Sequence, residues 1–179
     1  MVTNGFINKG PLDALLEVID AFSVDMKAFS EEFYTKVTSS KLEPVKETLK
    51  QIKLAGKHLE VVNLVIPELN DDDASFKAMT KWIANELGKE TVFHISRYFH
   101  SHKLTTEYTP VSLINKLAQL AVKELTYVYS GNIYSESNDT YCLHCGATLI
   151  TRRSYSINTD GLNDEGECKV CGNFFLKKT

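Results

Sequence analysis

The chain has 179 residues, of which 43% are hydrophobic and 24% are charged, and its formal net charge is −3. This length and apolar content are enough to bury a hydrophobic core, which excludes disorder as the default interpretation. The small negative charge gives no electrostatic case for nucleic acid or an anionic membrane as a partner. We find no apolar run of spanning length and no charged-then-apolar leader, a composition that favours a soluble cytoplasmic protein.

Strand patterns and helical patterns alternate along the first 130 residues. The expected strands are residues 2–6, 21–27, 61–67, 91–98 and 125–132. The expected helices begin near Gly10, Ser30, Glu43, Asp72 or Asp73, and Thr109. Single strands separated by helices are typical of a parallel α/β sheet with right-handed crossovers.

The strand expected at residues 61–67 organises this part of the chain. It is apolar except for Asn63, rich in β-branched residues, and ended by Pro67. These features predict a buried strand with a helix on each side in sequence. Function in such sheets collects where the strands end.

Two other strands alternate between apolar and polar side chains. The apolar positions, expected to face the helices, are Phe22, Val24, Met26, Phe93 and Ile95. The polar positions on the opposite face are Ser23, Asp25, Lys27, His94 and Ser96. If the sheet curls as part of a barrel, these polar residues face its lumen, where a purely structural barrel would carry Val, Ile and Leu. The alternation therefore predicts a polar ligand.

Several polar residues also have simpler interpretations. Asp25 and Lys27 are near enough to form an ion pair with each other, while Lys27 alone would suit a Schiff-base aldolase. His94, taken alone, fits a hydrogen-bonded core histidine as well as a catalytic one. The aspartates at residues 71–73 are interpreted as a helix cap, since consecutive carboxylates in one turn cannot all face one ion.

One basic cluster follows the fourth expected strand. It comprises Arg97, His100, His102 and Lys103. Such a cluster is compatible with a phosphate site, and a solvated loop is the alternative interpretation.

The C-terminal residues contain two C-x-x-C-G motifs. Their cysteines are Cys142, Cys145, Cys168 and Cys171. Two such knuckles bring four thiolates to one ion, and each glycine supplies the positive φ that the turn requires. The spacing favours a structural zinc site, with rubredoxin-like iron and disulfides as alternatives, and leaves room for a hairpin within residues 148–157. His144 is interpreted as a solvated bystander.

The chain also resembles the second half of the radical S-adenosylmethionine (SAM) barrel of pyruvate formate-lyase activating enzymes. The resemblance is carried by T-N-G at residues 3–5, D-x-K at residues 25–27, V-I-P-E-L-N-D-D at residues 65–72, and His94. It is closest to the radical SAM enzyme of the AmmeMemoRadiSam system. That likeness comes from Y-V-Y-x-G-N at residues 127–132 and from the Y-C-x-x-C-G pattern of the tail.

The resemblance implies an α/β fold with half of a TIM-type radical SAM barrel at residues 1–134. A linker at residues 135–140 and a rubredoxin-like zinc ribbon at residues 141–179 would follow. It implies that Asp25 and Lys27 contact SAM, that Thr3 and Asn4 lie at the end of an adjacent strand in the same site, and that His94 borders the cavity on the substrate side. In this family SAM chelates an iron of a [4Fe-4S] cluster, whose electron cleaves the sulfonium to give a 5′-deoxyadenosyl radical.

The family's cluster loop, C-x-x-x-C-x-x-C, has no counterpart here, because the first cysteine of this chain is Cys142. The resemblance thus implies a C-terminal part that is inactive alone, and it leaves open whether this chain is itself an enzyme. A half barrel has an unpaired edge strand, so we expect it to pair with the missing N-terminal half or to self-associate. A protein substrate is a further expected partner.

The alternative function is a non-catalytic α/β scaffold that displays a zinc ribbon to a protein or nucleic-acid partner. Nucleic acid is the less favoured of the two partners, given the weak charge of the tail.

Overall fold

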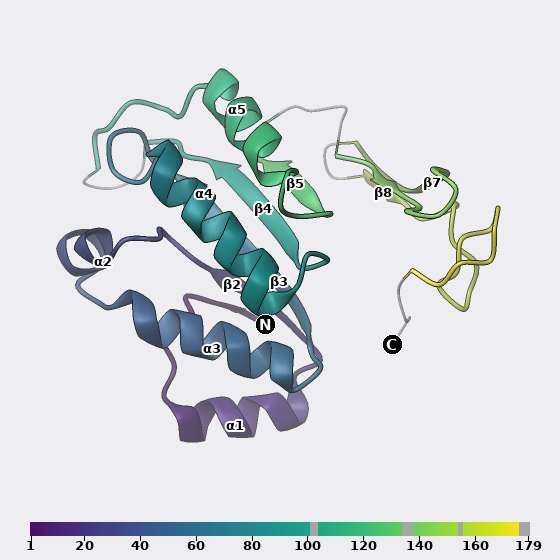
Figure 1. The fold of residues 1–179 in the computed structure, drawn as a ribbon, viewed down its shortest axis with the longest axis horizontal. Coiled ribbons are helices and arrows are strands. Elements are labelled where there is room, and N and C mark those ends of the chain that lie inside the picture. The colour runs from purple at the N-terminus through teal and green to yellow at the C-terminus, as the bar shows by residue number, and fades with distance from the viewer. Residues whose placement is uncertain (101–103, 134–137, 154–155, 176–179) are drawn as a thin grey trace. The chain divides into compact units, whose positions relative to one another are not determined.

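The computed structural model describes residues 1–100, 104–133, 138–153 and 156–175. By their internal contacts these residues form two compact units, Met1–Ile133 and Tyr134–Thr179. Figure 1 shows the α/β architecture of the first unit and the small strands of the second. Among the described helices, none combines the length and apolar character needed to cross a membrane.

The first unit is built on a five-stranded parallel sheet. Its strands are β1 (Val2–Thr3), β2 (Ala21–Asp25), β3 (His58–Val65), β4 (Val92–Arg97) and β5 (Val128–Gly131). They are ordered β1-β2-β3-β4-β5, and every neighbouring pair is parallel. The sheet therefore grows in one direction, with helical crossovers between neighbours. The predicted α/β fold with five parallel strands is confirmed.

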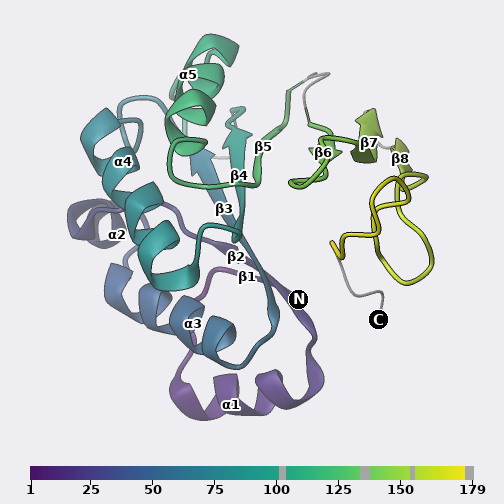
Figure 2. The same ribbon diagram turned by 45° about the vertical axis from the view of Figure 1, so that its right-hand side comes forward.

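Helices cover one side of this sheet, as Figure 2 shows for α1, α3, α4 and α5. They are α1 (Lys9–Val18), α2 (Glu31–Val37), α3 (Leu42–Leu54), α4 (Asp73–Trp82) and α5 (Val111–Ala121), with a single π-helical turn, η1 (Ile83–Leu87), after α4. Phe22, Val24, Phe93 and Ile95 are at most 1% exposed beneath them. The predicted apolar face is thus the core.

Side-chain caps fix two of the helix starts. The Ser30 hydroxyl accepts a hydrogen bond from the Phe33 amide at 3.3 Å at the start of α2. The Asp72 carboxylate accepts one from the Ser75 amide at 2.8 Å at the start of α4. Of the two neighbouring aspartates, Asp71 accepts from the Glu68 amide and Asp73 pairs with Lys116. The interpretation of residues 71–73 as a capping turn is confirmed.

β3 differs from the strand expected at residues 61–67. It begins at His58 and ends at Val65, and only every second side chain is buried. Helices cover a single face, so Glu60, Val62 and Leu64 are directed to the other face. The predicted burial is confirmed for alternate residues, such as Val61 and Val65, whereas Val62 and Leu64 are half-buried. The first strand is also shorter than expected, because Gly5 turns the chain at φ 72° after β1. The last strand covers Val128–Gly131 instead of residues 125–132.

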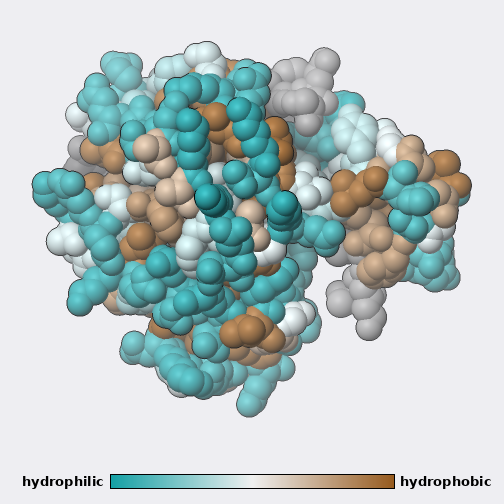
Figure 3. Space-filling model, viewed as in Figure 1, coloured by the Kyte–Doolittle hydropathy of each residue, from teal (hydrophilic) through white to brown (hydrophobic). Residues whose placement is uncertain are grey.

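The outer surface of the helices is largely hydrophilic, as the space-filling view in Figure 3 shows. This is the surface expected of amphipathic helices that bury one apolar stripe against a sheet. In the same view, hydrophobic residues cover more of the visible surface of the second unit. Its exposed apolar side chains include Leu143 and Val170, which lie inside the two cysteine motifs.

The second unit contains three short antiparallel strands, β6 (Thr140–Tyr141), β7 (Thr148–Arg153) and β8 (Ser156–Asn158). β7 and β8 pair antiparallel as the expected hairpin does, and the pairing extends to Asn158, one residue beyond the expected range of 148–157. Thr140 lies in the expected linker but belongs to β6, and Asp139 beside it accepts a hydrogen bond from the Arg152 amide at 2.9 Å. The linker residues 135–137 lie outside the described residues.

Candidate functional site

The sheet face opposite the helices carries half-exposed polar side chains. Asp25, Val62, His94 and Tyr129 are in register across β2, β3, β4 and β5, so their side chains point to the same side. The neighbouring rows are Ser23, Glu60 and Val92 toward the strand starts, and Leu64, Ser96 and Gly131 toward the strand ends. The predicted alternation of polar and apolar faces is confirmed.

Asp25 and Lys27 form an ion pair, which was one of the interpretations that the sequence allowed for these two residues. The Lys27 Nζ lies 2.8 Å from the Asp25 carboxylate, and both side chains are about one-third exposed, at 32% and 29%. A pair this accessible contributes little to stability. Its charges are available to a polar ligand on the open face.

The backbone of Lys27 is held by three other side chains. Its amide donates to the Tyr34 hydroxyl at 3.1 Å, and its carbonyl accepts from Asn63 at 3.0 Å and from Asn70 at 2.6 Å. Burial raises the pKa of Tyr34 to about 12, so its hydroxyl stays neutral. Asn70 also bonds to the Leu64 carbonyl, which ties the end of β2 to the end of β3.

Glu60 lies between two histidines on the open face. Its carboxylate oxygens accept hydrogen bonds from His58 Nε2 at 3.2 Å and from His94 Nε2 at 3.0 Å. These bonds hold the pKa of Glu60 well below its usual range, because they stabilise the carboxylate more than partial burial destabilises it. The Tyr129 ring packs on the other side of His94, with ring centroids 5.6 Å apart. The ring of His94 is therefore fixed in place.

Thr3 and Asn4 are placed differently from Asp25. Thr3 pairs with Val24, so its side chain shares the helix side of the sheet and does not join the open face. The Thr3 hydroxyl accepts a hydrogen bond from the Gly5 amide at 3.2 Å, and the side-chain Oδ1 of Asn4 accepts one from the Phe6 amide at 3.0 Å. Both side chains stabilise the turn after β1. The structure places Asp25 and His94 in one row of the open face, with Val62 between them, pairs Lys27 with Asp25, and leaves Thr3 outside that group.

Sequence reasoning missed the residues that support this group. Tyr34, Asn70 and Glu60 had no assigned role, although Asn63 stood out as the single polar residue of an apolar strand. Asn63 is 1% exposed and donates to the carbonyls of Met26 and Lys27. A buried amide in an apolar strand was the available signal.

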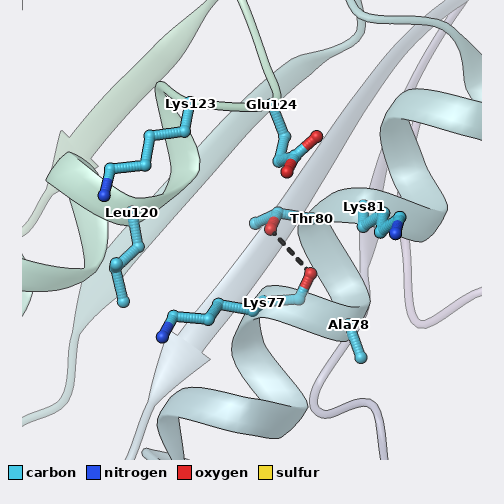
Figure 4. A pocket seen from close by; sticks show the side chains of 7 residues that line it. All are labelled: Lys77, Ala78, Thr80, Lys81, Leu120, Lys123 and Glu124. Atoms are coloured by element: carbon cyan, nitrogen blue, oxygen red, sulfur yellow. Dashed lines mark hydrogen bonds between the residues drawn. The ribbon is translucent and has the colours of Figure 1, made fainter.

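The described residues of the first unit line at least two hollows. One, of about 210 Å³, is at the carboxyl edge of the sheet, between the loops after β2 and β3, and includes Ser30 and Asn70. The other, of about 260 Å³, lies between α4 and α5. Figure 4 shows Lys77 and Lys123 extending on either side of Leu120 there. This second hollow is on the outer helix layer, away from the open face.

The four cysteines of the second unit converge. Their sulfur atoms all lie within 4.8 Å of one another, with Cys142 to Cys171 at 3.6 Å and Cys145 to Cys168 at 3.7 Å. Four thiolates bound tetrahedrally at about 2.3 Å from a metal would have sulfur atoms roughly 3.8 Å apart. A disulfide would need about 2.05 Å. The thiols are unpaired, and their geometry fits a metal ion.

The two knuckles have the same backbone geometry. In each, the first cysteine amide donates to a carbonyl five residues later, and the glycine amide donates to the first cysteine carbonyl, all at 2.8 Å. Gly146 and Gly172 both have φ 72°, as predicted. Amides of Cys145 and His144 directed at the Cys142 sulfur lower the pKa of its thiol to about 6, so this sulfur is a ready metal ligand.

Comparison with solved structures identifies the fold. The chain superposes on a domain of a pyruvate-formate lyase-activating enzyme from Bacteroides vulgatus with a TM-score of 0.64 and 12% identity, covering 73% of this chain and 79% of that one. The fold is that of a partial radical SAM barrel. A radical SAM methyltransferase from Sphaerobacter thermophilus superposes with a TM-score of 0.61 and 13% identity, covering 72% of this chain and 38% of that one.

An uncharacterised protein of Methanocaldococcus jannaschii is 41% identical over 176 residues, which cover 96% of this chain. They cover 52% of that protein, so the chain spans about half the length of this curated relative. No family model matches the chain.

Proposed function

We propose that this chain supplies the SAM-contacting half of a radical SAM enzyme of the activating-enzyme type, within the AmmeMemoRadiSam branch. The observation that carries the proposal is the shared open face of Asp25, Lys27 and His94, on a sheet with a partial radical SAM fold. SAM carries an ammonium, a carboxylate and ribose hydroxyls. The carboxylate of Asp25 and the amine of Lys27 complement these groups.

When bound to SAM, a [4Fe-4S] cluster would supply the electron that cleaves the sulfonium. All four cysteines of this chain belong to the C-terminal unit, so we propose that the cluster ligands come from polypeptide outside it. The length of the archaeal relative, about twice the matched region, is consistent with such a segment. The partner would add strands to the exposed edge of β1, and a second copy of the chain would compete for that edge.

We further propose that the four-cysteine unit holds structural zinc. Four thiolates fill a tetrahedral site and leave no open position for chemistry, and a unit this small needs a metal to stay folded. Rubredoxin-like iron is the alternative, which elemental analysis would distinguish. The reduced thiols also support a cytoplasmic location.

The test is SAM binding by the purified chain, measured by isothermal titration calorimetry. We expect weak binding that N-terminal polypeptide from the longer relative strengthens, and that Asp25→Asn lowers about tenfold, as loss of one charge-assisted hydrogen bond predicts. Asp13→Asn on exposed α1, which also breaks an ion pair with a lysine, is the matched control. Absence of SAM binding in the reconstituted pair would end the proposal.

There are two other candidate functions, and a structural observation supports only the first of them. A scaffold that displays the ribbon is supported by Leu143 and Val170, which are 63% and 74% exposed at the two knuckles. A Schiff-base aldolase would use Lys27, which borohydride would trap with an aldehyde or ketone. The 2.8 Å contact with Asp25 favours an electrostatic role for this lysine over a nucleophilic one.

A further inference from the structure

Arg97 is fixed at the carboxyl end of β4 by three contacts. Its Nε donates to the Thr109 carbonyl at 2.6 Å, and its own carbonyl accepts from the Asn132 side chain at 3.0 Å. Its guanidinium lies 4.7 Å from the centroid of the Phe99 ring. Within the described residues, no carboxylate lies within ion-pair distance of this partly buried cation. Its two terminal nitrogens have no partner there either.

Aromatic rings extend from this guanidinium. Phe99 packs on Tyr108 with centroids 5.6 Å apart, and Tyr108 packs on His100 at 4.2 Å. Phe99 and Tyr108 are 44% and 47% exposed. Large aromatic side chains exposed together beside an unpaired arginine are typical of a binding surface.

The platform formed by Arg97, Phe99, His100 and Tyr108 is anchored to the sheet. The Thr109 hydroxyl donates to the Val65 carbonyl at 2.6 Å and accepts from the Tyr98 amide at 3.0 Å. The loop that carries Tyr108 is thereby joined to the ends of β3 and β4. Parallel α/β sheets bind ligands at this carboxyl edge.

We propose that this platform binds an oxyanion group, a carboxylate or a phosphate, that is attached to a flat ring. The two terminal nitrogens of Arg97 match two oxygens of such a group. Because the arginine side chain is already held in place, binding the ligand costs it little conformational entropy. Phe99 and Tyr108 contact the ring. This site is separate from the proposed SAM site, because the register pairs Arg97 with Val65, on the helix side of the sheet. His102 and Lys103, the other members of the predicted basic cluster, lie outside the described residues.

The test is an NMR titration of the ¹⁵N-labelled full chain with phenyl phosphate, benzoate and inorganic phosphate. We expect amide shifts at Phe99, His100 and Tyr108, and tighter binding of a ring-bearing anion than of inorganic phosphate. Whichever of phenyl phosphate and benzoate binds more tightly identifies the anionic group. Arg97→Gln should weaken that binding about 10-fold to 100-fold, as expected for charge-assisted hydrogen bonds.

Two further variants separate the parts of the platform. Arg97→Lys keeps the charge and loses the fork, so it should bind at least about fivefold more weakly than the wild-type chain while remaining folded. Phe99→Leu should weaken the ring-bearing anions and leave inorganic phosphate unchanged.

Lys123→Gln is the matched control, because it removes the same charge from the lysine-lined hollow of Figure 4. It should bind as the wild-type chain does. The inference would be overturned if Lys123→Gln weakened binding as much as Arg97→Gln does, or if Arg97→Lys bound with wild-type affinity. It would also be overturned if inorganic phosphate bound as tightly as both ring-bearing anions. None of these measurements uses SAM, so failure here leaves the proposed function standing, and absence of SAM binding leaves this site standing.

Discussion

Replacement of Asn63 by aspartate tests the buried amide that supports Lys27. Asn63 is 1% exposed, and its Nδ2 donates to the carbonyls of Met26 at 2.8 Å and Lys27 at 3.0 Å. In N63D an isosteric carboxylate would face these two carbonyl oxygens in a dry site. We expect a loss of about 3 to 5 kcal/mol in the free energy of unfolding at pH 7, as for other uncompensated buried charges.

The loss should depend on pH with a definite sign. Burial against carbonyl oxygens raises the pKa of the introduced carboxyl in the folded state, since only its protonated form can donate a hydrogen bond. The variant should therefore be least destabilised below about pH 4, the unfolded pKa of aspartate, and lose about 1.4 kcal/mol per pH unit as the pH rises toward the folded pKa.

Urea unfolding at several pH values, followed by the fluorescence of Trp82, measures this effect. Trp82 is the single tryptophan of the chain and ends α4, so it reports on the first unit alone. Asn4→Asp is the control, because the Asn4 oxygen already accepts a bond from the Phe6 amide and a carboxylate would keep it. A pH-independent N63D, or one within about 0.5 kcal/mol of wild type at pH 7, would refute the orientation of this amide.

Three other predictions follow from the structure. Glu60→Gln should lower stability by up to about 1 kcal/mol at pH 6, a value kept small because the group is partly exposed. Because the folded pKa of Glu60 is depressed, this difference should shrink as the pH falls below about 4.5, which acid titration of both proteins would measure. Asp72→Ala should cost about 1 kcal/mol by loss of the α4 cap, whereas Asp72→Asn, which can still accept the bond, should cost less in the same urea assay. Metal removal by a chelator, or Cys145→Ser, should unfold the second unit and leave the far-ultraviolet circular dichroism of the helices unchanged. Loss of the helical signal would contradict this metal-dependent folding, and so would purified protein that contains no metal.

Local patterns were sufficient for much of the fold. The apolar and polar alternation around Asp25 and His94 gave the correct faces of β2 and β4, because strand side chains alternate whatever the strand pairs with. Caps such as Asp72 and the glycines of the knuckles were also predictable, since each acts within a few residues. The four cysteines were recognised as one cluster for a different reason, because paired C-x-x-C-G motifs are typical of a single metal site.

Strand position was less predictable. The starting residue of β3 could not be read from its apolar run, because an apolar residue fits either a buried or a half-exposed face. Only the placement of the helices on one side decided that Val62 and Leu64 are directed away from the core.

The sequence by itself determined the alternation of strands and helices and the two faces of β2 and β4, because each follows from contacts between near neighbours in the chain. It also indicated the thiolate cluster, because two C-x-x-C-G motifs are typical of one metal site even when many residues separate them. Only the tertiary structure decided which polar groups meet. Glu60 bonds to His94 across 34 residues, Asn70 holds Lys27 across 43, and the register of β1 turns Thr3 away from Asp25. Such contacts depend on strand register and helix cover, and no local pattern specifies either of them.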